Sequence, residues 1–400
     1  MNILFIDFNR VGKGSYWRAR QFGQNLAARG HAVTLIVTSR DRRFGIRTSD
    51  LEGLRLVEMP DLFTGSLRSG WDLWNILNRI ARVRKMQFDI VHAIQARPTV
   101  LVPALYLKYV KGVPLVLDWV DWLGRGGSVE ERTHPLTRAA LRPVETFLDE
   151  KFRTCADGTI VICTTLLEKA IDLGVPPESI LLLPDGADTN RLRPIDQQEA
   201  RQRIGLPGDV TLVGHIGSMF PRDAQLLAQA FDLVHKRLSS VRLLIIGHCA
   251  IEFRRLVQAP GAVIQTGVIE DRYLNDYLAS CDVCLLPLKD TGANRGRRPL
   301  KLNDYMAVGR PTVSTAVGDI PALFKEEAIG YLAEDQPESF ASQIVQLLGN
   351  PDLRAAIGER ARQVAERRFS WVRLTDQLET FYRQIFGHDF PLNGTGSSQT

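Results

Sequence analysis

The stretch Ile3–Phe8, with the sequence ILFIDF, decides the fold class of the chain. It is apolar without polar alternation, and two glycines and a helical pattern follow it within a few residues. Similar short apolar runs alternate with helical patterns through the first half of the chain, at Val33–Thr38, Asp89–Ile94, Pro114–Leu117 and Gly158–Cys163. Such strands are buried on both faces, which predicts a parallel sheet with helices on each side.

The same alternation restarts after a polar segment rich in proline and glycine. The pattern predicts a strand at Val210–Ile216 and a helix at Asp223–Leu238. It predicts further strands at Val241–Ile246, Ala262–Gln265, Cys284–Pro287 and Pro311–Ser314. Two α/β units of similar size predict two doubly wound, Rossmann-like domains that face a cleft. The predicted parts are a first domain over 1–190, a linker over 191–209, a second domain over 210–369, an amphipathic helix over 370–386 and a disordered tail over 387–400.

Composition narrows the classes of function. Hydrophobic residues make up 44% of the 400 residues, and the net charge of +5 with a pI near 9.0 fits a small anionic ligand or an acidic membrane surface. Basic residues do not alternate with aromatics as they do on nucleic-acid platforms, so no nucleic-acid partner is expected.

Three further features bear on location and metal binding. The start of the chain lacks a signal-peptide pattern, and the longest apolar run, Val100–Val110, is too short to cross a bilayer. Cys281 and Cys284 have no second pair or nearby histidine, which favours packing over metal binding. We therefore expect a cytoplasmic protein without a metal site.

The first glycine turn is a candidate phosphate contact. Gly12 and Gly14 precede a helix, where backbone amides and the helix dipole attract an anion. A dinucleotide fingerprint would also need a glycine where Trp17 stands and an acid near Arg40. A plain tight turn is an equal alternative, and a dehydrogenase is the weakest interpretation.

The second domain opens on a similar turn, at Gly217, with Arg222 at the start of the next helix. A cation at a helix N-terminus is unfavourable unless an anion lies there, so Arg222 is a candidate for binding a diphosphate. A solvated surface arginine is the alternative.

The most informative segment is 294–314, NRGRRPLKLNDYMAVGRPTVS. A basic loop containing Arg297 and Arg298 leads into a helix whose first turn holds Lys301 and Asp304 on one face. The ammonium group could bind phosphate, and the carboxylate could accept hydrogen bonds from two ribose hydroxyls. A surface ion pair would not explain the arginines that crowd the loop.

This segment resembles the C-terminal signature of the family-4 retaining glycosyltransferases, in the form P-x-K-L-x-E-Y-M-A-x-G-R-P. Further stretches match in order: 217–231, the family's donor-phosphate turn and helix; 268–288, its base-binding loop and strand; 183–188, its P-N-G-V-D turn; 317–321; and 369–371. The resemblance covers nearly the whole chain.

The resemblance implies GT-B architecture, with the donor in the second domain, the acceptor in the first, and the last helix crossing back onto the first. Arg222 takes the place of the phosphate-binding lysine, Asp304 that of the ribose-binding glutamate of E-x7-E, and the amides around Ile269 face the nucleobase. The implied reaction is retaining transfer from a nucleotide-diphosphate sugar, without a separate cofactor, in polysaccharide or glycoconjugate synthesis.

Three positions depart from the family pattern. The first acid of E-x7-E falls on Gly296, the usual arginine after the second domain's first strand is Ser218, and the usual sugar-facing histidine is Ile94. His92, two residues earlier, is a candidate catalytic residue, and a core histidine is an equal alternative. A nucleotide-sugar epimerase on the same fold and a non-catalytic sugar-nucleotide binder therefore stay open as alternatives.

Two further features concern the acceptor. Asp118 follows a buried strand, where acids point to the ligand crevice, and it is the second catalytic candidate, with capping of the following glycine loop as its alternative. No D-x-D motif occurs, which favours transfer without a metal. The helical pattern at Trp71–Lys85 has a cationic end that could touch anionic lipid, as a lipid-linked rather than a free sugar acceptor would require, although a packing helix is the more common reading.

Overall fold

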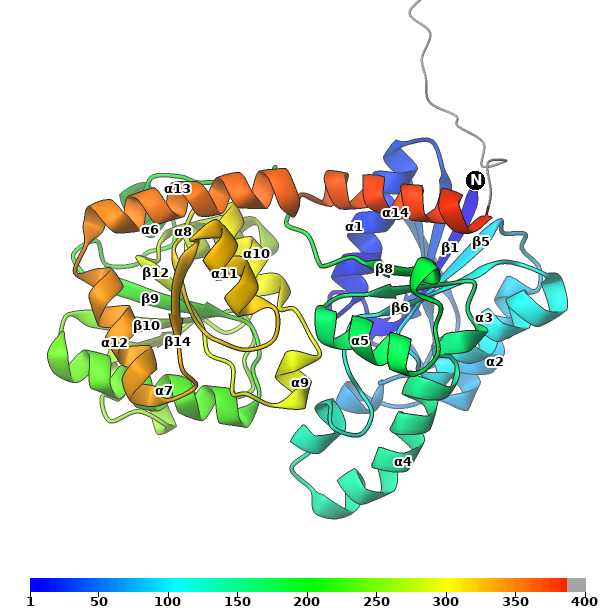
Figure 1. The fold of residues 1–400 in the computed structure, drawn as a ribbon, viewed down its shortest axis with the longest axis horizontal. Helices are drawn as coiled ribbons and strands as arrows, with labels where there is room; N and C mark the ends of the chain where they lie inside the picture. The colour runs from blue at the N-terminus through cyan, green and yellow to red at the C-terminus, as the bar shows by residue number, and fades with distance from the viewer. Residues whose placement is uncertain (387–400) are drawn as a thin grey trace, which may run out of the picture. The chain divides into compact units, whose positions relative to one another are not determined.

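The computed structural model describes residues 1–386, apart from the side chain of Ser66. Its contacts divide the chain into two compact units, each with its own sheet (Figure 1). Unit 1 contains Met1–Pro184 and the segment that begins at Trp371, and unit 2 contains Asp185–Ser370. The predicted disordered tail, 387–400, lies outside the described residues.

Unit 1 is built on an eight-stranded sheet in the order β3-β4-β2-β1-β5-β6-β7-β8. All neighbouring strands are parallel except β3 and β4, which form an antiparallel pair. The strands are β1 (Asn2–Arg10), β2 (Ala32–Thr38), β3 (Arg47–Leu51), β4 (Leu54–Met59), β5 (Ile90–Ile94), β6 (Leu115–Trp119), β7 (Gly158–Val161) and β8 (Ile180–Leu182).

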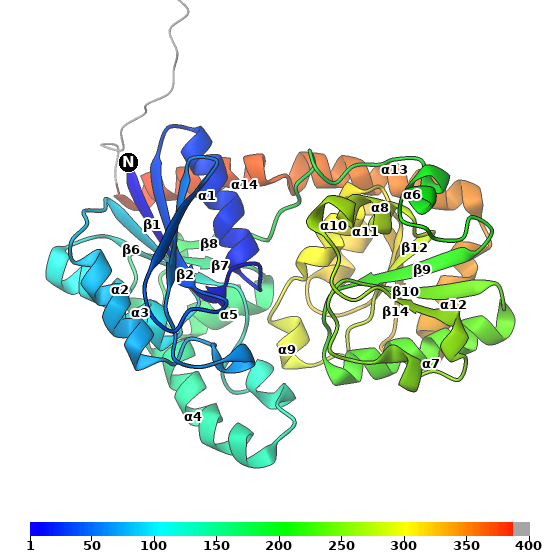
Figure 2. The same ribbon diagram turned by 180° about the vertical axis from the view of Figure 1, so that it is seen from behind.

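Helices cover this sheet, and the last helix of the described chain is one of them. α1 packs against α14, while α2 lies beside α3, as Figures 1 and 2 both show. The helices are α1 (Tyr16–Ala28), α2 (Leu73–Val83), α3 (Pro98–Lys111), α4 (Pro135–Lys151), α5 (Thr164–Asp172) and α14 (Trp371–Phe386).

Unit 2 has a six-stranded sheet in the order β11-β10-β9-β12-β13-β14, with every pairing parallel. Its strands are β9 (Thr211–Ile216), β10 (Val241–Ile246), β11 (Val263–Gln265), β12 (Val283–Leu286), β13 (Thr312–Thr315) and β14 (Gly330–Ala333). Its helices are α6 (Gln197–Arg203), α7 (Pro221–Arg237), α8 (Leu274–Ala279), α9 (Gly292–Arg295), α10 (Leu300–Ala307), α11 (Ile320–Glu327), α12 (Pro337–Leu348) and α13 (Pro351–Arg368).

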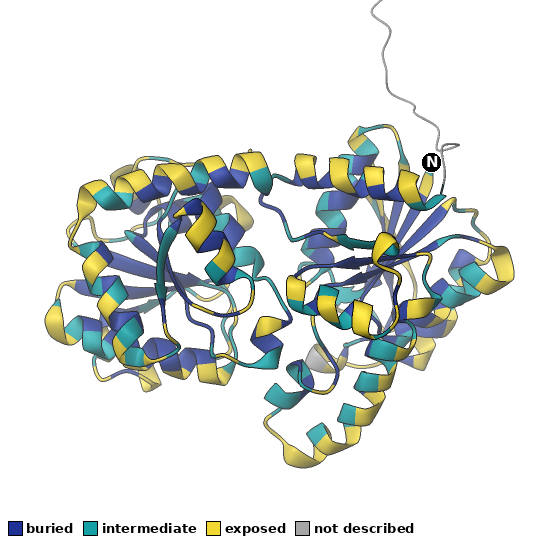
Figure 3. Ribbon diagram, viewed as in Figure 1, coloured by how far each residue is buried: buried dark blue, intermediate teal, exposed yellow. Residues whose placement is uncertain are grey.

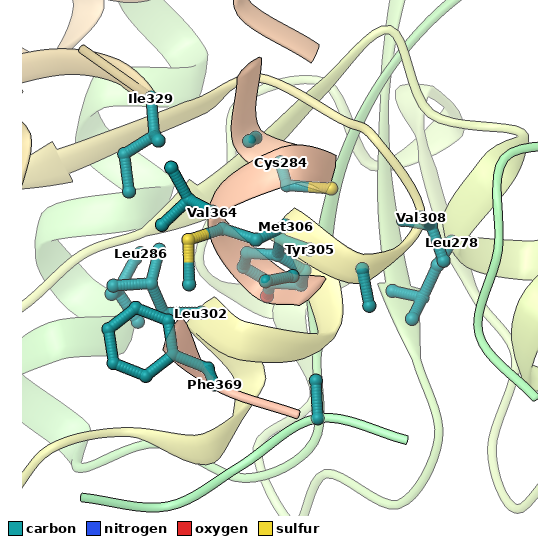
Figure 4. Close-up of a cluster of buried hydrophobic side chains, with 14 of the residues drawn as sticks. Leu278, Cys284, Leu286, Leu302, Tyr305, Met306, Val308, Ile329, Val364 and Phe369 are labelled. Atoms are coloured by element: carbon teal, nitrogen blue, oxygen red, sulfur yellow. The ribbon is translucent and has the colours of Figure 1, made fainter. Parts of the chain in front are cut away.

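The apolar strands explain this layering. The strands of both sheets are largely buried, and the helices are exposed on their outer sides (Figure 3). In unit 2 one core cluster joins β12, α10 and α13 and contains Leu302, Tyr305, Met306 and Phe369 (Figure 4). A second cluster, on α7 and α12, contains Phe231 and Phe340.

Both sheets are doubly wound, and this places their candidate sites. In unit 1 the strand order reverses between β1 and β5, and in unit 2 it reverses between β9 and β12. Ligands of open α/β sheets bind outside the carboxyl ends of the strands at this reversal. The turn with Gly12 and Gly14 follows β1, and the turn with Gly217 follows β9, so both candidate turns lie at these positions.

The structure differs from the sequence predictions in several places, and the edge strands β8 and β14 were not predicted. The β3–β4 hairpin was not predicted, because the exposed strand β3 (RTSDL) lacks an apolar run. The segment 191–209, predicted as a linker, is folded into unit 2. It contains α6, whose buried Arg201 donates to the backbone oxygens of Gly208, Val210 and Ser280 and pairs with Asp282 at 2.9 Å.

Candidate functional site

A lysine and a histidine meet at the strand reversal of unit 2. His215 lies on β9, and its Nδ1 is 2.9 Å from the carbonyl oxygen of Leu285 on the neighbouring strand β12. A carbonyl oxygen only accepts, so Nδ1 carries the proton and Nε2 is left as an acceptor. Lys301 Nζ, from the first turn of α10, lies 3.1 Å from this Nε2 and donates to the Ser218 carbonyl at 2.9 Å. The ammonium group is thereby held at the carboxyl end of β9.

The surroundings of Lys301 disfavour its charge. Burial, reinforced by the nearby Arg297, lowers the pKa of Lys301 from 10.5 to about 7. Burial and the lysine charge together lower the pKa of His215 well below its usual value, so the imidazole stays neutral. A bound anion would favour the charged lysine, and this makes Lys301 responsive to phosphate.

An acidic side chain in the first turn of α7, that of Asp223, lies close enough to Lys301 for its charge to act on the lysine. Asp223 is buried and accepts hydrogen bonds from the backbone amide of Lys289 at 2.8 Å and from Asn294 Nδ2 at 3.0 Å. Arg222, the residue before it, is exposed and forms no ion pair with another described residue. A cation at this helix start is therefore available to a ligand.

The arginines of the basic loop each have a protein partner. Arg295 pairs with Asp290 at 2.5 Å. Arg297 lies 3.5 Å from Asp223 and stacks over the ring of Phe220. Arg298 stacks over the ring of Phe369, with 4.1 Å between guanidinium carbon and ring centroid. The loop is thus fixed by its arginines, and a phosphate contact from Arg297 or Arg298 would be added to these interactions.

Gly217 has a different role from the one that its sequence position indicates. Its φ of +74° favours glycine, but its amide already donates to the carbonyl of Ile246 at 2.8 Å. The expected contact between this amide and phosphate is therefore not available in this arrangement. The glycine instead allows the tight turn that brings Ser218 to Lys301.

Asp304 lies one turn along α10 from Lys301. Leu302, Tyr305 and Met306 point into the core (Figure 4), which leaves Asp304 partly exposed. Burial, reinforced by Asp185, Asp188 and Asp271, raises its pKa to about 7 despite the opposing charge of Arg191. Such a carboxyl group can accept or donate a hydrogen bond near neutral pH.

Ile269 follows β11, beyond its carboxyl end. Its side chain is partly buried against the core cluster of α10, which anchors the loop between β11 and α8. Both neighbours of Ile269 are exposed. The prediction that the loop amides face a nucleobase is not tested by this geometry.

In unit 1, the two catalytic candidates lie in a fully buried network. Asp118, on β6, pairs with Arg18 of α1 at 2.7 Å and with His92 Nε2 of β5 at 3.1 Å. His92 Nδ1 lies 2.6 Å from the hydroxyl of Tyr382 on α14. Arg18 also donates to the carbonyls of Leu183 and Pro184. This geometry favours a structural role, in which the network joins α1, two strands and α14.

The alternative role of Asp118, capping of the glycine loop that follows β6, is wrong because another acid accepts the hydrogen bonds of that loop. The amides of Leu123 and Gly124 in the following loop donate to Asp149 of α4, at 3.0 and 3.1 Å. Asp118 is instead held by Arg18 and His92, which lower the pKa of this carboxyl against the effect of burial.

The glycine turn after β1 is held by hydrogen bonds of its own side chains and by one arginine from the segment after β2. Ser15 donates to Asp7 at 2.9 Å and accepts from Asn9 Nδ2 at 2.7 Å. Gly12 and Gly14 have φ values of +76° and +53°. Burial raises the pKa of Asp7 to about 6. The turn is also held by Arg40, whose Nε donates to the Val11 carbonyl at 2.7 Å, and nothing in its geometry tests a phosphate contact.

Sequence reasoning missed two residues of the unit 2 site, His215 and Asp223. An acid in the first turn of a helix is a recognisable capping signal, so Asp223 could have been found. His215 follows an apolar run within a buried strand, and nothing local distinguishes it from a core histidine. No grouping of three or more metal-ligand side chains occurs within residues 1–386.

The chain belongs to the family-4 glycosyltransferases. A family model described as "Glycosyl transferases group 1" matches residues 210–350, and one described as "Glycosyl transferase 4-like domain" matches residues 13–186. The fold is that of GT-B glycosyltransferases. The described part of the chain contains no helix long and apolar enough to span a bilayer.

Particular relatives and solved structures support this assignment. D-inositol 3-phosphate glycosyltransferase of Saccharomonospora viridis is 27% identical over 52% of this chain and 51% of its own length. N-acetyl-alpha-D-glucosaminyl L-malate synthase of Bacillus anthracis is 25% identical over 58% and 61%. The chain thus spans little more than half the length of these relatives.

Among solved structures, sucrose-phosphate synthase from Thermosynechococcus elongatus has a TM-score of 0.76 at 20% identity, over 96% of this chain and 99% of that one. WaaG, a glycosyltransferase involved in lipopolysaccharide biosynthesis, has 0.72 at 18%, over 96% and 100%. HepE from Anabaena, in complex with UDP and glucose, has 0.68 at 17%, over 96% and 99%. These likenesses concern the fold.

Proposed function

We propose that the protein is a retaining glycosyltransferase that transfers a sugar from a nucleotide-diphosphate donor to an acceptor hydroxyl, without a bound metal, in polysaccharide or glycoconjugate synthesis. The observation that carries the proposal is the position of Lys301. It is a cation of lowered pKa, held by His215 and the Ser218 carbonyl at the strand reversal of unit 2. The complex of HepE with UDP-glucose supports a donor of this class.

The leaving diphosphate gains charge as the glycosidic bond breaks. Lys301 and Arg222 stabilise that charge, because preorganised cations are most effective where charge develops in the transition state. One of Arg297 or Arg298 adds to this field. Asp304 fixes the ribose through its hydroxyls, and the amides around Ile269 contact the base.

The acceptor belongs to unit 1 in this proposal. Its hydroxyl attacks from the face that the diphosphate leaves, and a phosphate oxygen takes the hydroxyl proton, so the configuration at the anomeric carbon is retained. The amides of Gly12 and Gly14 stay candidate phosphate contacts. In this proposal Asp118 and His92 do not contact the substrate; they hold α1 and α14 against strands β5 and β6 of unit 1.

A panel of nucleotide sugars tests the donor proposal. UDP-, GDP-, ADP- and dTDP-sugars are added to the protein, and the expected result is a rise in melting temperature with one donor base, since a ligand of the native state stabilises it. Slow hydrolysis or transfer of that donor should persist in EDTA. Loss of activity on chelation, restored by Mg²⁺ or Mn²⁺, contradicts the metal-free mechanism.

Variants then place the diphosphate. Lys301→Ala and Arg222→Ala should each lower kcat/KM about ten- to a hundredfold, because a charge-assisted contact contributes about 1.5–3 kcal/mol. Arg360→Ala, at an exposed arginine of α13, is the matched control and should behave as wild type. Wild-type kinetics in both site variants overturn the placement. Donor binding without turnover identifies a non-catalytic binder instead.

A further inference from the structure

The chain passes between the two units at two places, and buried side chains hold the first passage on both sides. Unit 1 ends there at Pro184 and unit 2 begins at Asp185. Arg18 of unit 1 donates to the carbonyl oxygens of Leu183 at 2.9 Å and Pro184 at 3.1 Å. Asn303 of unit 2 donates from Nδ2 to the carbonyl oxygen of Asp185 at 2.6 Å. Two consecutive carbonyl groups are therefore held by side chains of different units.

These hydrogen bonds leave little freedom at the first passage. Arg18 is 2% exposed and pairs with the buried Asp118, and Asn303 is fully buried in α10. Because peptide groups are planar, only the φ and ψ angles of Asp185 lie between the carbonyl groups of Pro184 and Asp185. Rotation of the chain at the first passage is therefore concentrated at Asp185 while both sets of hydrogen bonds persist.

The second passage is hydrogen-bonded to the chain that leaves the first. Unit 2 ends at Ser370 and unit 1 resumes at Trp371. The carbonyl oxygen of Phe369 accepts from the amide of Ala187 at 2.7 Å, and Ala187 also forms an isolated bridge with Ser370. On the unit 1 side, the Trp371 ring meets the Phe22 ring of α1 edge-on, with 5.1 Å between the centroids. A displacement of residues 185–187 therefore acts directly on the second passage.

Both passages are attached to the helix that carries the donor candidates. Asn303 follows Lys301 by two residues and directly precedes Asp304, so all three lie in one turn of α10. Leu302, in the same turn, packs in one core cluster with Phe369 of the second passage (Figure 4). Helix α10 thus reaches the first passage by a hydrogen bond and the second through a shared core.

An arginine of α13 strengthens this attachment. Arg362 donates to the carbonyl oxygens of Leu192 and Ala307 at 2.7 Å and to that of Thr189 at 2.9 Å. Ala307 is the last residue of α10, and residues 189–192 follow the first passage closely. The helix is therefore fixed at both ends to the chain that enters unit 2.

Packing alone does not account for Asn303. Its Oδ1 is buried and has no hydrogen-bond partner within residues 1–386. An unsatisfied amide oxygen costs free energy, which an apolar side chain would avoid, but only the amide supplies the hydrogen bond to Asp185. The first passage is also linked to the donor candidates by charge. Burial raises the pKa of Asp304, and the charge of Asp185 adds to this effect.

We propose that Asn303 is a positioning residue that couples occupancy of the donor site to the first passage of the chain. A donor that binds Lys301 and Asp304 orders the turn of α10 to which Asn303 belongs, and the hydrogen bond to Asp185 transmits this order to the passage. Residues at such passages absorb the torsional changes of domain motion, so their order bears on the catalytic cycle. The inference rests on the proposed donor site of unit 2.

Hydrogen exchange of the full chain, read by mass spectrometry, tests this coupling. The ligand is whichever of UDP, GDP, ADP and dTDP most raises the melting temperature of the wild type. In the wild type, this nucleoside diphosphate should slow the exchange of residues 185–188 about tenfold. Asn303→Ala should abolish the slowing but bind the ligand within about threefold of the wild-type affinity, because Lys301 and Asp304 are unchanged. Without ligand, the variant should exchange residues 185–188 about tenfold faster than the wild type.

Asn350→Ala is the matched control. It removes another asparagine of unit 2, which accepts from the Leu353 amide at 3.0 Å and caps α13. Its exchange over residues 185–188 should equal that of the wild type, with and without ligand. A merely structural role of Asn303 would instead raise exchange throughout unit 2 in Asn303→Ala and leave the ligand-dependent slowing intact.

Three results would overturn the inference. Slowing that persists in Asn303→Ala places the coupling elsewhere, and an equal effect of Asn350→Ala reduces it to general destabilisation. Loss of ligand binding in Asn303→Ala, at a wild-type melting temperature, assigns the residue to the donor site itself. Failure of the proposed function looks different, because the wild type would then bind no nucleoside diphosphate. In that case equal exchange of residues 185–188 in the ligand-free wild type and Asn303→Ala would still refute the role of the hydrogen bond to Asp185.

Discussion

Donor binding should take up a proton at Lys301. The pKa of Lys301 is lowered to about 7 in the free protein, from 10.5. A diphosphate close to Nζ would return the pKa toward its ordinary value, because an opposite charge favours the charged form. At pH 8 the free lysine is about 10% protonated and the bound lysine almost fully, so about 0.9 proton is taken up per site. At pH 6 the uptake falls to about 0.1 proton.

Calorimetry of nucleoside diphosphate binding measures this uptake directly. Titrations at pH 8 in two buffers of different ionisation enthalpy give the number of protons, and the affinity should weaken about tenfold for each pH unit above 7. Terminal phosphate groups titrate near pH 6, so their contribution at pH 8 is small. Asp304, with its pKa raised to about 7, is already largely ionised at pH 8.

Two substitutions separate Lys301 from other groups. Lys301→Met should abolish the uptake and weaken binding, while Lys301→Arg should bind without uptake, since arginine stays protonated. Asp304→Asn should retain the uptake of the wild type at pH 8. Uptake that persists in Lys301→Met, or its absence in the wild type at pH 8, would refute the reasoning.

Two further predictions concern stability. The pKa of Asp304 in the folded protein is raised above its value in the unfolded chain, so the protein loses stability as pH rises from about 4 to 7. Asp304→Asn removes this loss and should stabilise the protein by about 1–2 kcal/mol at pH 8 and by less at pH 5. Thermal melts of both proteins at the two pH values measure the difference. Asp118→Asn should lower the free energy of unfolding by about 3–5 kcal/mol in urea, because it leaves Arg18 buried without its charge partner; wild-type stability with reduced turnover would instead support a catalytic Asp118.

The two-unit fold could be predicted because the strands carry their own signal. The apolar runs at Ile3–Phe8 and Val210–Ile216 are buried on both faces, and each prediction matches a parallel strand. β3 could not be found in this way, because its exposed, polar sequence depends on pairing with β4.

The candidate site was predictable only in part. The first turn of α10 follows from the sequence, since Lys301 and Asp304 share a helix face. The contact of Lys301 with His215 joins residues 86 positions apart, and no local pattern reports it. The same limit applies to Asp118 and His92. A strand end indicates a ligand crevice, but their burial depends on Tyr382 of α14, which lies far along the chain.

The position of α14 has a consequence for how the protein is made. Unit 1 is discontinuous, because its last helix follows the whole of unit 2 in the chain. During synthesis on the ribosome, the hydrogen bond between His92 and Tyr382, which completes the network of Asp118, therefore cannot form until 185–370 has been synthesised. The ion pairs of Glu379 with Arg29 and His31 form equally late. A fragment ending at Pro184 would keep these polar groups without the helix that covers them. We therefore expect residues 1–184 joined by a flexible linker to 371–386 to be more stable than 1–184 alone, because this form keeps the contacts of Tyr382 and Glu379.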